Sequence, residues 1–125
     1  MCRADHSAGP EAPLTIETAT HGHVTVLALT GALSFPEGTA LLRGRSRELV
    51  AGGARRLVFD LTAVPWIDSC GLGEIVACYK RAREVGGEVK LVLQNLPHRQ
   101  FTYCHLDRMF EIYPDAPAAL AGFGG

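Results

Sequence analysis

A short polar segment in the middle of the chain has the residue types of a modification site. Asp68 and Ser69 follow the apolar run 57–61 and a turn, and stand directly before a stretch with helical spacing. A serine at or near a helix N-cap can accept a hydrogen bond from a backbone N–H of the first turn, which is the plain capping interpretation. The same position also suits a phosphoserine, because the amino end of a helix favours negative charge. A phosphate would add roughly −1.5 to −2 charges beside Asp68, which the fold tolerates and which can disturb a docked partner.

Other reactive side chains form weaker patterns. An esterase needs the pattern Gly-x-Ser-x-Gly, and Ile67 stands where the first glycine would precede Ser69. Cys70 is either a redox-sensitive thiol at a helix start or a small residue packed in a tight loop. His21 and His23 flank a turn, where a metal pair would need further ligands and a solvated turn is the alternative. We therefore expect no metal, no cofactor and no catalytic activity.

The composition indicates one globular domain of ordinary size. The chain has 125 residues, 47% of them hydrophobic and 20% charged, which is enough to build a core without metal or disulfide cross-links. The net charge of −1 gives no broad attraction to nucleic acid or to an acidic membrane. The four cysteines form no Cys-x-x-Cys pair, and no apolar run resembles a signal peptide or a membrane span. We expect a reduced, cytoplasmic setting, with no nucleic-acid partner and no membrane insertion.

The hydrophobic spacing predicts alternating strands and helices around the Asp-Ser pair. Period-two alternation and short apolar runs predict strands at 14–18, 24–29, 57–61, 89–93 and 110–113. Helical spacing predicts helices at 39–50, 69–84 and 99–106, and a last helical turn or two at 115–120. A loop at 62–68 would carry the chain out of the third strand. The first two strands are expected to be antiparallel neighbours.

A short sequence pattern that occurs twice predicts the topology. Residues 52–59 and 86–93 each place a glycine pair, which ends a helix, directly before an apolar strand. Two such units imply parallel strands joined by right-handed helical crossovers. The expected fold class is α/β: a mixed, mostly parallel sheet of four to five strands, with the helices packed on it as a layer. The domain would span 13–121, between a flexible arm at 1–12 and a flexible tail at 122–125.

The residues around Ser69 also resemble a known family. The run DLTAVPWIDSCGLG at 60–73 is similar to the signature of STAS domains, the anti-sigma factor antagonists. The runs LTGAL at 29–33, GGEVKLV at 86–92 and LDRMFEIY at 106–113 support the resemblance, which covers about 14–121. It implies a sheet of four or five strands with helices packed on it.

The resemblance further implies a role in bacterial partner switching. An anti-sigma factor kinase would phosphorylate Ser69, and a phosphatase would reverse the reaction. The unphosphorylated antagonist would bind the anti-sigma factor and free a sigma factor, and phosphorylation would abolish that binding. Two residues depart from the family pattern: Cys70 replaces a second serine or threonine, and Ser34 replaces an acidic residue expected near the phosphorylation site.

These considerations give one leading hypothesis and two alternatives. The leading hypothesis is an anti-sigma factor antagonist controlled at Ser69. The alternatives are a structural subunit of a stress-sensing or lipid-transport assembly without reversible phosphorylation, and an enzyme using Ser69 or Cys70. A homodimer is left open. The residues expected to contact the partner are Ser34, Phe35, Asp68, Cys70, Gly71 and Leu72.

Overall fold

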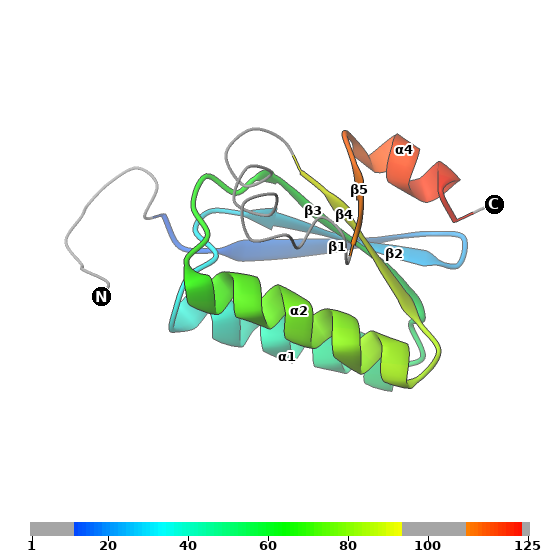
Figure 1. The fold of residues 1–125 in the computed structure, drawn as a ribbon, viewed down its shortest axis with the longest axis horizontal. Helices are drawn as coiled ribbons and strands as arrows, with labels where there is room; N and C mark the ends of the chain where they lie inside the picture. Colours follow the sequence, from blue (N-terminus) through cyan, green and yellow to red (C-terminus); the bar gives the residue numbers. More distant parts are fainter. Residues whose placement is uncertain (1–11, 94–109, 124–125) are drawn as a thin grey trace.

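The computed structural model describes residues 12–93 and 110–123, which form a sheet with helices on both faces (Figure 1). The strands are β1 (Thr15–His21), β2 (Val24–Thr30), β3 (Arg56–Ala63), β4 (Glu88–Val92) and β5 (Glu111–Tyr113). The helices are α1 (Glu37–Ala51), α2 (Ser69–Glu84) and α4 (Ala116–Ala121). Among these residues, no helix has the length and apolar character of a membrane span.

The sheet has the predicted mixed topology. Its order is β1-β2-β3-β4-β5, with β1 antiparallel to β2 and every later pair parallel. The antiparallel pair turns at Gly22, whose φ of 66° is a conformation that glycine adopts without strain. Helices α1 and α2 connect β2 to β3 and β3 to β4. The carboxyl ends of β2 and β3 therefore lie at the same edge of the sheet, and both chain segments leave there.

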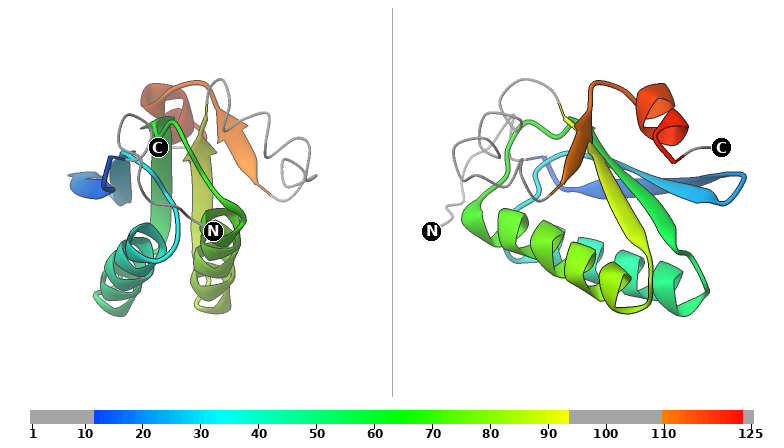
Figure 2. Two further views of the ribbon diagram at one scale, coloured as in Figure 1. Left: turned by 90° about the vertical axis from the view of Figure 1, so that its left-hand side faces the viewer. Right: turned by 45° about the vertical axis from the view of Figure 1, so that its right-hand side comes forward.

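The two faces of the sheet are covered by different helices. Figure 2 shows α1 and α2 side by side against one face and α4 against the other. The larger core lies under α1 and α2, and its fully buried side chains include Leu27, Leu42, Phe59, Ile75 and Leu91. The expectation that all helices form one layer is thus wrong for α4. The physical reason is a second apolar set on the opposite face, which α4 covers with Ala119: Val24, Val26, Val58 and Val92.

Some boundaries differ from the sequence-based prediction. Strand β3 continues to Ala63, two residues into the predicted loop, and α1 begins at Glu37 rather than at residue 39. The predicted helix 99–106 lies outside the described residues. The arm 1–12 and the tail 122–125 lie largely outside them too and stay predictions, although Phe123 packs against the second core.

Candidate functional site

Two loops meet at the carboxyl edge of the sheet, next to the start of α2. Leu33, after β2, forms an isolated parallel bridge with Ile67, before α2. The Leu33 N–H donates to the carbonyl oxygen of Trp66 at 2.9 Å, and the Asp68 N–H donates to the carbonyl oxygen of Leu33 at 3.3 Å. Because Leu33 and Ile67 are both fully buried, these main-chain bonds are anchored in the core. The loop that contains Ser34 and the turn that contains Ser69 are thereby held side by side.

The carboxylate of Asp68 joins the two loops. Its Oδ1 accepts from the Gly71 N–H at 2.7 Å, which caps α2, and its Oδ2 accepts from the Phe35 N–H at 3.0 Å. The predicted capping role of the Ser69 hydroxyl is therefore wrong: Asp68 is the N-cap and Ser69 is the first residue of the helix. Both residue types cap helices well, so only the backbone geometry decides between them.

The side chain of Ser69 is available to solvent. Ser69 is exposed, and its hydroxyl makes no hydrogen bond with any residue of the described part of the chain. It stands in the first turn of α2, where backbone N–H groups lack partners within the helix. Ser69 belongs to neither core cluster, so a substituent on its hydroxyl would replace no core contact.

Gly71 brings the helix close to the neighbouring loop. A Cβ atom on Gly71 would lie 2.3 Å from the carbonyl oxygen of Leu33, so any other residue would push α2 away from this loop. Gly71 is accordingly buried, and Leu72 is half-buried against the larger core. Among the predicted partner-binding residues, Phe35 and Cys70 are the exposed ones.

The two loops that meet beside the start of α2 each carry an aromatic side chain that is open to solvent. Phe35 is 56% exposed and Trp66 is 45% exposed. The sequence analysis missed Trp66, although a tryptophan beside a proline in a predicted loop was a signal that could have identified it. We call the set Phe35, Trp66, Ser69, Cys70 and Gly73 the Ser69 surface; all five residues are exposed.

The two described segments that contain the residues of this surface carry negative and no positive charge. The segments 31–42 and 57–73 contain Glu37, Asp60 and Asp68 but no lysine or arginine. The carboxylate of Asp60 is hydrogen-bonded within its own strand, because its Oδ1 accepts from both the backbone N–H and the hydroxyl of Thr62. These two segments therefore offer no cation that could neutralise an added phosphate.

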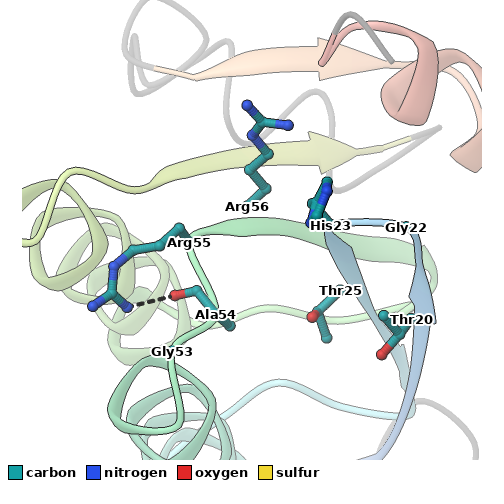
Figure 3. Close-up of a pocket in the computed structure, with 8 residues that line it drawn as sticks. All are labelled: Thr20, Gly22, His23, Thr25, Gly53, Ala54, Arg55 and Arg56. Atoms are coloured by element: carbon teal, nitrogen blue, oxygen red, sulfur yellow. Dashed lines mark hydrogen bonds between the residues drawn. The ribbon is translucent and has the colours of Figure 1, made fainter.

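A hollow at the opposite edge of the sheet is a weaker candidate. It has a volume of about 440 Å³, and Figure 3 shows its lining residues: Thr20, Gly22, His23, Thr25, Gly53, Ala54, Arg55 and Arg56. The guanidinium of Arg55 turns back to the carbonyl oxygen of Ala54 at 2.9 Å, and Arg56 extends away from the two threonines. The polar groups do not converge on one point, so the hollow lacks the arrangement of a binding site.

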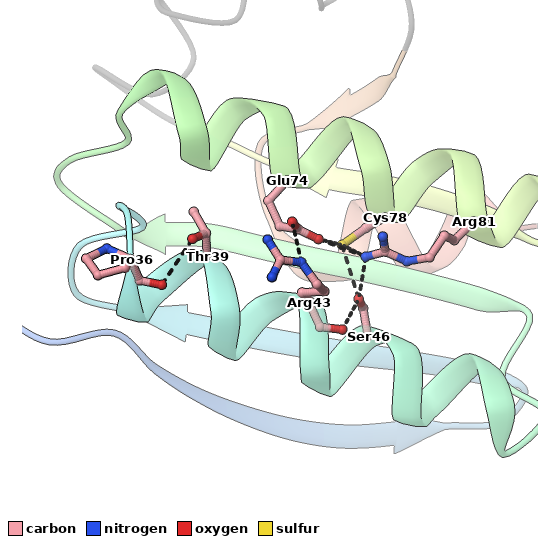
Figure 4. A network of polar contacts seen from close by, with 7 residues as sticks. All are labelled: Pro36, Thr39, Arg43, Ser46, Glu74, Cys78 and Arg81. Atoms are coloured by element: carbon pink, nitrogen blue, oxygen red, sulfur yellow. Dashed lines mark hydrogen bonds and ion pairs between the residues drawn. The ribbon is translucent and has the colours of Figure 1, made fainter.

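A buried polar cluster connects α1 and α2 (Figure 4). Glu74, only 6% exposed, accepts from Arg43 Nε at 3.2 Å and from Arg81 Nη2 at 2.8 Å. The hydroxyl of Ser46 lies 3.1 Å from the Cys78 sulfur. Burial raises the pKa of the Cys78 thiol to about 11, so this cysteine stays protonated and is a poor nucleophile. Within the described ranges, no group of three or more histidine, cysteine or acidic side chains is arranged to hold a metal ion.

Comparisons with known proteins agree with the resemblance. The chain is 29% identical over 115 residues to the anti-sigma-F factor antagonist RsfB of Mycobacterium tuberculosis, covering 90% of this chain and 91% of the relative. It is 28% identical to an anti-sigma F factor antagonist of Paenibacillus polymyxa, covering 86% and 92% of the two chains.

Solved structures show the same architecture. The crystal structure of an anti-sigma factor antagonist from Mycobacterium paratuberculosis matches with a TM-score of 0.79 at 26% identity, covering 93% of this chain and 97% of that one. Unphosphorylated SpoIIAA matches with a TM-score of 0.71 at 15% identity, over 89% of this chain and 99% of that one, a likeness of fold alone. The family model described as STAS domain matches residues 15–119. This chain therefore belongs to the STAS domain family.

Proposed function

We propose that this chain is an anti-sigma factor antagonist controlled at Ser69. It binds an anti-sigma factor kinase while Ser69 is unphosphorylated and is released when that kinase phosphorylates it. A phosphatase restores binding. The observation that carries the proposal is the exposed Ser69 hydroxyl, which has no hydrogen bond within the described residues. The two loops that meet at the start of its helix each present an exposed aromatic side chain, Phe35 and Trp66. The relatives are named anti-sigma factor antagonists, which supports the proposed role. The proposed role is binding rather than catalysis, and its proposed setting is the cytoplasm.

The physical basis of the switch is the contrast between the free and the docked state. In the free domain, the phosphate extends into water and lies at the amino end of α2, where backbone N–H groups favour an anion. In the complex, the same phosphate would be enclosed between the partner and the Ser69 surface. The segments of this chain that carry the Ser69 surface, 31–42 and 57–73, contain no lysine or arginine that could pair with it. Burying a doubly charged group without a partner is far more costly than leaving it in water. Phosphorylation therefore weakens docking and leaves the fold intact.

The exposed aromatic residues are the proposed anchors of the partner. Tryptophan and other large side chains near the centre of an interface often carry much of the binding free energy. Phe35 and Trp66 are each roughly half exposed, and the main-chain bonds of Leu33 hold their loops together. Cys70 belongs to this surface and Ser34 precedes Phe35 in the same loop; both depart from the family pattern and would influence which kinase recognises the surface.

The test is binding of purified anti-sigma factors from the source organism to variants of this chain. Ser69→Asp should bind at least tenfold more weakly than the wild type, and Ser69→Ala should bind like the wild type. Thr18→Asp, at an exposed residue of β1, adds the same charge elsewhere and should leave the affinity unchanged. Calorimetry gives the affinities, and mass spectrometry after incubation with kinase and ATP should find phosphate on Ser69.

One outcome would favour the alternative role. If a partner binds the wild type and Ser69→Asp equally well, and no phosphate appears on Ser69, the switch is wrong. The chain would then act as a constant structural subunit of a larger complex.

A further inference from the structure

Two of the helical glycines have no explanation within the described chain. A glycine in a helix interior lowers helix stability relative to alanine, so it needs a reason. Gly71 and Gly38 have one, because an added Cβ would lie 2.3 Å and 2.9 Å from main-chain oxygens. Gly73 in α2 and Gly44 in α1 have none, since a Cβ at either position meets no atom within 4 Å.

The position of Gly73 distinguishes it from Gly44. Gly73 follows Ser69 by four residues in α2, so it lies on the same side of the helix, about 6 Å further along the axis. It is exposed and belongs to the Ser69 surface. Gly44 lies in the middle of α1, about two turns beyond the loop that carries Phe35. The two residues thus share the same local environment, and Gly73 alone is next to the modification site.

We infer that Gly73 is the point where the docked anti-sigma factor lies directly against the main chain of α2. This inference rests on the proposed function and adds the contact geometry. The occupant is an apolar segment of the anti-sigma factor, because the loops at the start of α2 expose two large apolar side chains. Trp66 stands three residues before Ser69, and the backbone N–H of Phe35 donates to Asp68, the N-cap of α2. A glycine lets another chain approach a backbone more closely than any residue with a Cβ.

Close contact at Gly73 would also explain why a phosphate on Ser69 weakens docking strongly. A segment packed on Gly73 covers the preceding turn of the same helix face, where the Ser69 oxygen stands. The partner then has no room to move outward around a phosphate without losing its contact with the helix. The two residues therefore act together. Gly73 permits close docking, and phosphorylation of Ser69 prevents it.

The experiment compares Gly73→Ala with the matched control Gly44→Ala in the full chain. Both variants should show a higher urea midpoint than the wild type, because alanine favours the helix and nothing in the fold obstructs the methyl group. The probe is the purified anti-sigma factor that binds the wild type in the test described above. Gly73→Ala should bind it about tenfold more weakly, equivalent to ~1.4 kcal/mol, and Gly44→Ala should bind it like the wild type. Gly73→Leu should weaken binding further.

The outcomes separate this inference from the function on which it rests. If Gly73→Ala and Gly73→Leu both bind the anti-sigma factor as tightly as the wild type does, the inferred close contact at Gly73 is wrong. The proposed antagonist role would then stand. If Gly44→Ala weakens binding as much as Gly73→Ala, the effect belongs to the helices in general, which also overturns the inference. If no anti-sigma factor binds the wild type, the proposed function fails, and this inference fails with it.

Discussion

At the scale of single residues, Asp68 connects the two segments of the candidate site. Its two carboxylate oxygens accept hydrogen bonds from Gly71 and from Phe35, which lies 33 positions earlier in the chain. One side chain thus fixes both the start of α2 and the loop that presents Phe35. The side chain of Ser69, the next residue, is exposed and makes no hydrogen bond with the described part of the chain.

Replacing Asp68 should therefore cost more than replacing an ordinary helix cap. Asp68→Ala should lower the free energy of unfolding by about 2 kcal/mol, because it removes a cap and a hydrogen bond to a charged acceptor. The matched control is Asp115→Ala at the N-cap of α4, where, among the described residues, the carboxylate accepts a hydrogen bond only from the Ala118 N–H of that helix. That change should cost about 1 kcal/mol. Urea unfolding measures both, and equal losses would show that the bond to Phe35 adds no stability.

Residue-level features were the hardest to predict from the sequence. An Asp-Ser pair before a helix contains two good caps, and the sequence does not say which of them the helix uses. The position of the Trp66 loop also depends on a tertiary contact. Ile67, the next residue, forms a bridge with Leu33, which lies far away in the sequence. The family resemblance identified Ser69 because the motif is local, whereas its neighbours in space come from another loop.

At the scale of elements, α1 and α2 are joined by a polar cluster as well as by apolar contacts. Glu74 of α2 pairs with Arg43 of α1 and with Arg81 of its own helix (Figure 4). Since α1 follows the loop that contains Phe35 and α2 begins at Ser69, this cluster joins α2 to the helix that follows the Phe35 loop. The pairing of α1 with α2 therefore supports the relative position of the two segments that carry the Ser69 surface.

Removing the shared carboxylate should separate the effect of this cluster from that of surface charge. Glu74→Ala should lower the free energy of unfolding by about 3 kcal/mol, because it leaves two arginines without their buried partner. Glu48→Ala is the control: this glutamate is 77% exposed and lies 3.8 Å from Arg45, so its loss should change stability by less than about 0.5 kcal/mol. If thermal or urea unfolding finds the two variants alike, the buried cluster does not hold the helices together.

Elements were predicted well where hydrophobic spacing is regular. The spacing of Leu72, Ile75, Val76 and Tyr79 predicted α2, and the glycine pairs before β3 and β4 predicted the parallel crossovers. The face on which α4 lies was not predictable in the same way. A six-residue helix rich in alanine carries little periodic signal, and its side of the sheet depends on the valines of three other strands.

At the scale of the whole molecule, the sheet separates two cores with different tasks. The larger core positions α1 and α2 and thus the Ser69 surface. The smaller one buries valines of β2, β3 and β4 beneath α4, on the opposite face (Figure 2). Because the two cores share only the sheet, the α4 face should contribute to stability without taking part in partner binding.

A charge placed beneath α4 tests this division. Ala119 is fully buried in the second core, so Ala119→Asp should lower the free energy of unfolding by about 3 kcal/mol, since a carboxylate there is removed from water among valine side chains. Ala121→Asp, two residues later in the same helix and exposed, should cost no more than about 0.5 kcal/mol. The folded fraction of Ala119→Asp should still bind the anti-sigma factor with wild-type affinity, because every residue of the Ser69 surface precedes β4 and none belongs to the second core. A loss of affinity in the folded Ala119→Asp protein, with Ala121→Asp unaffected, would show that the sheet transmits changes from one face to the other.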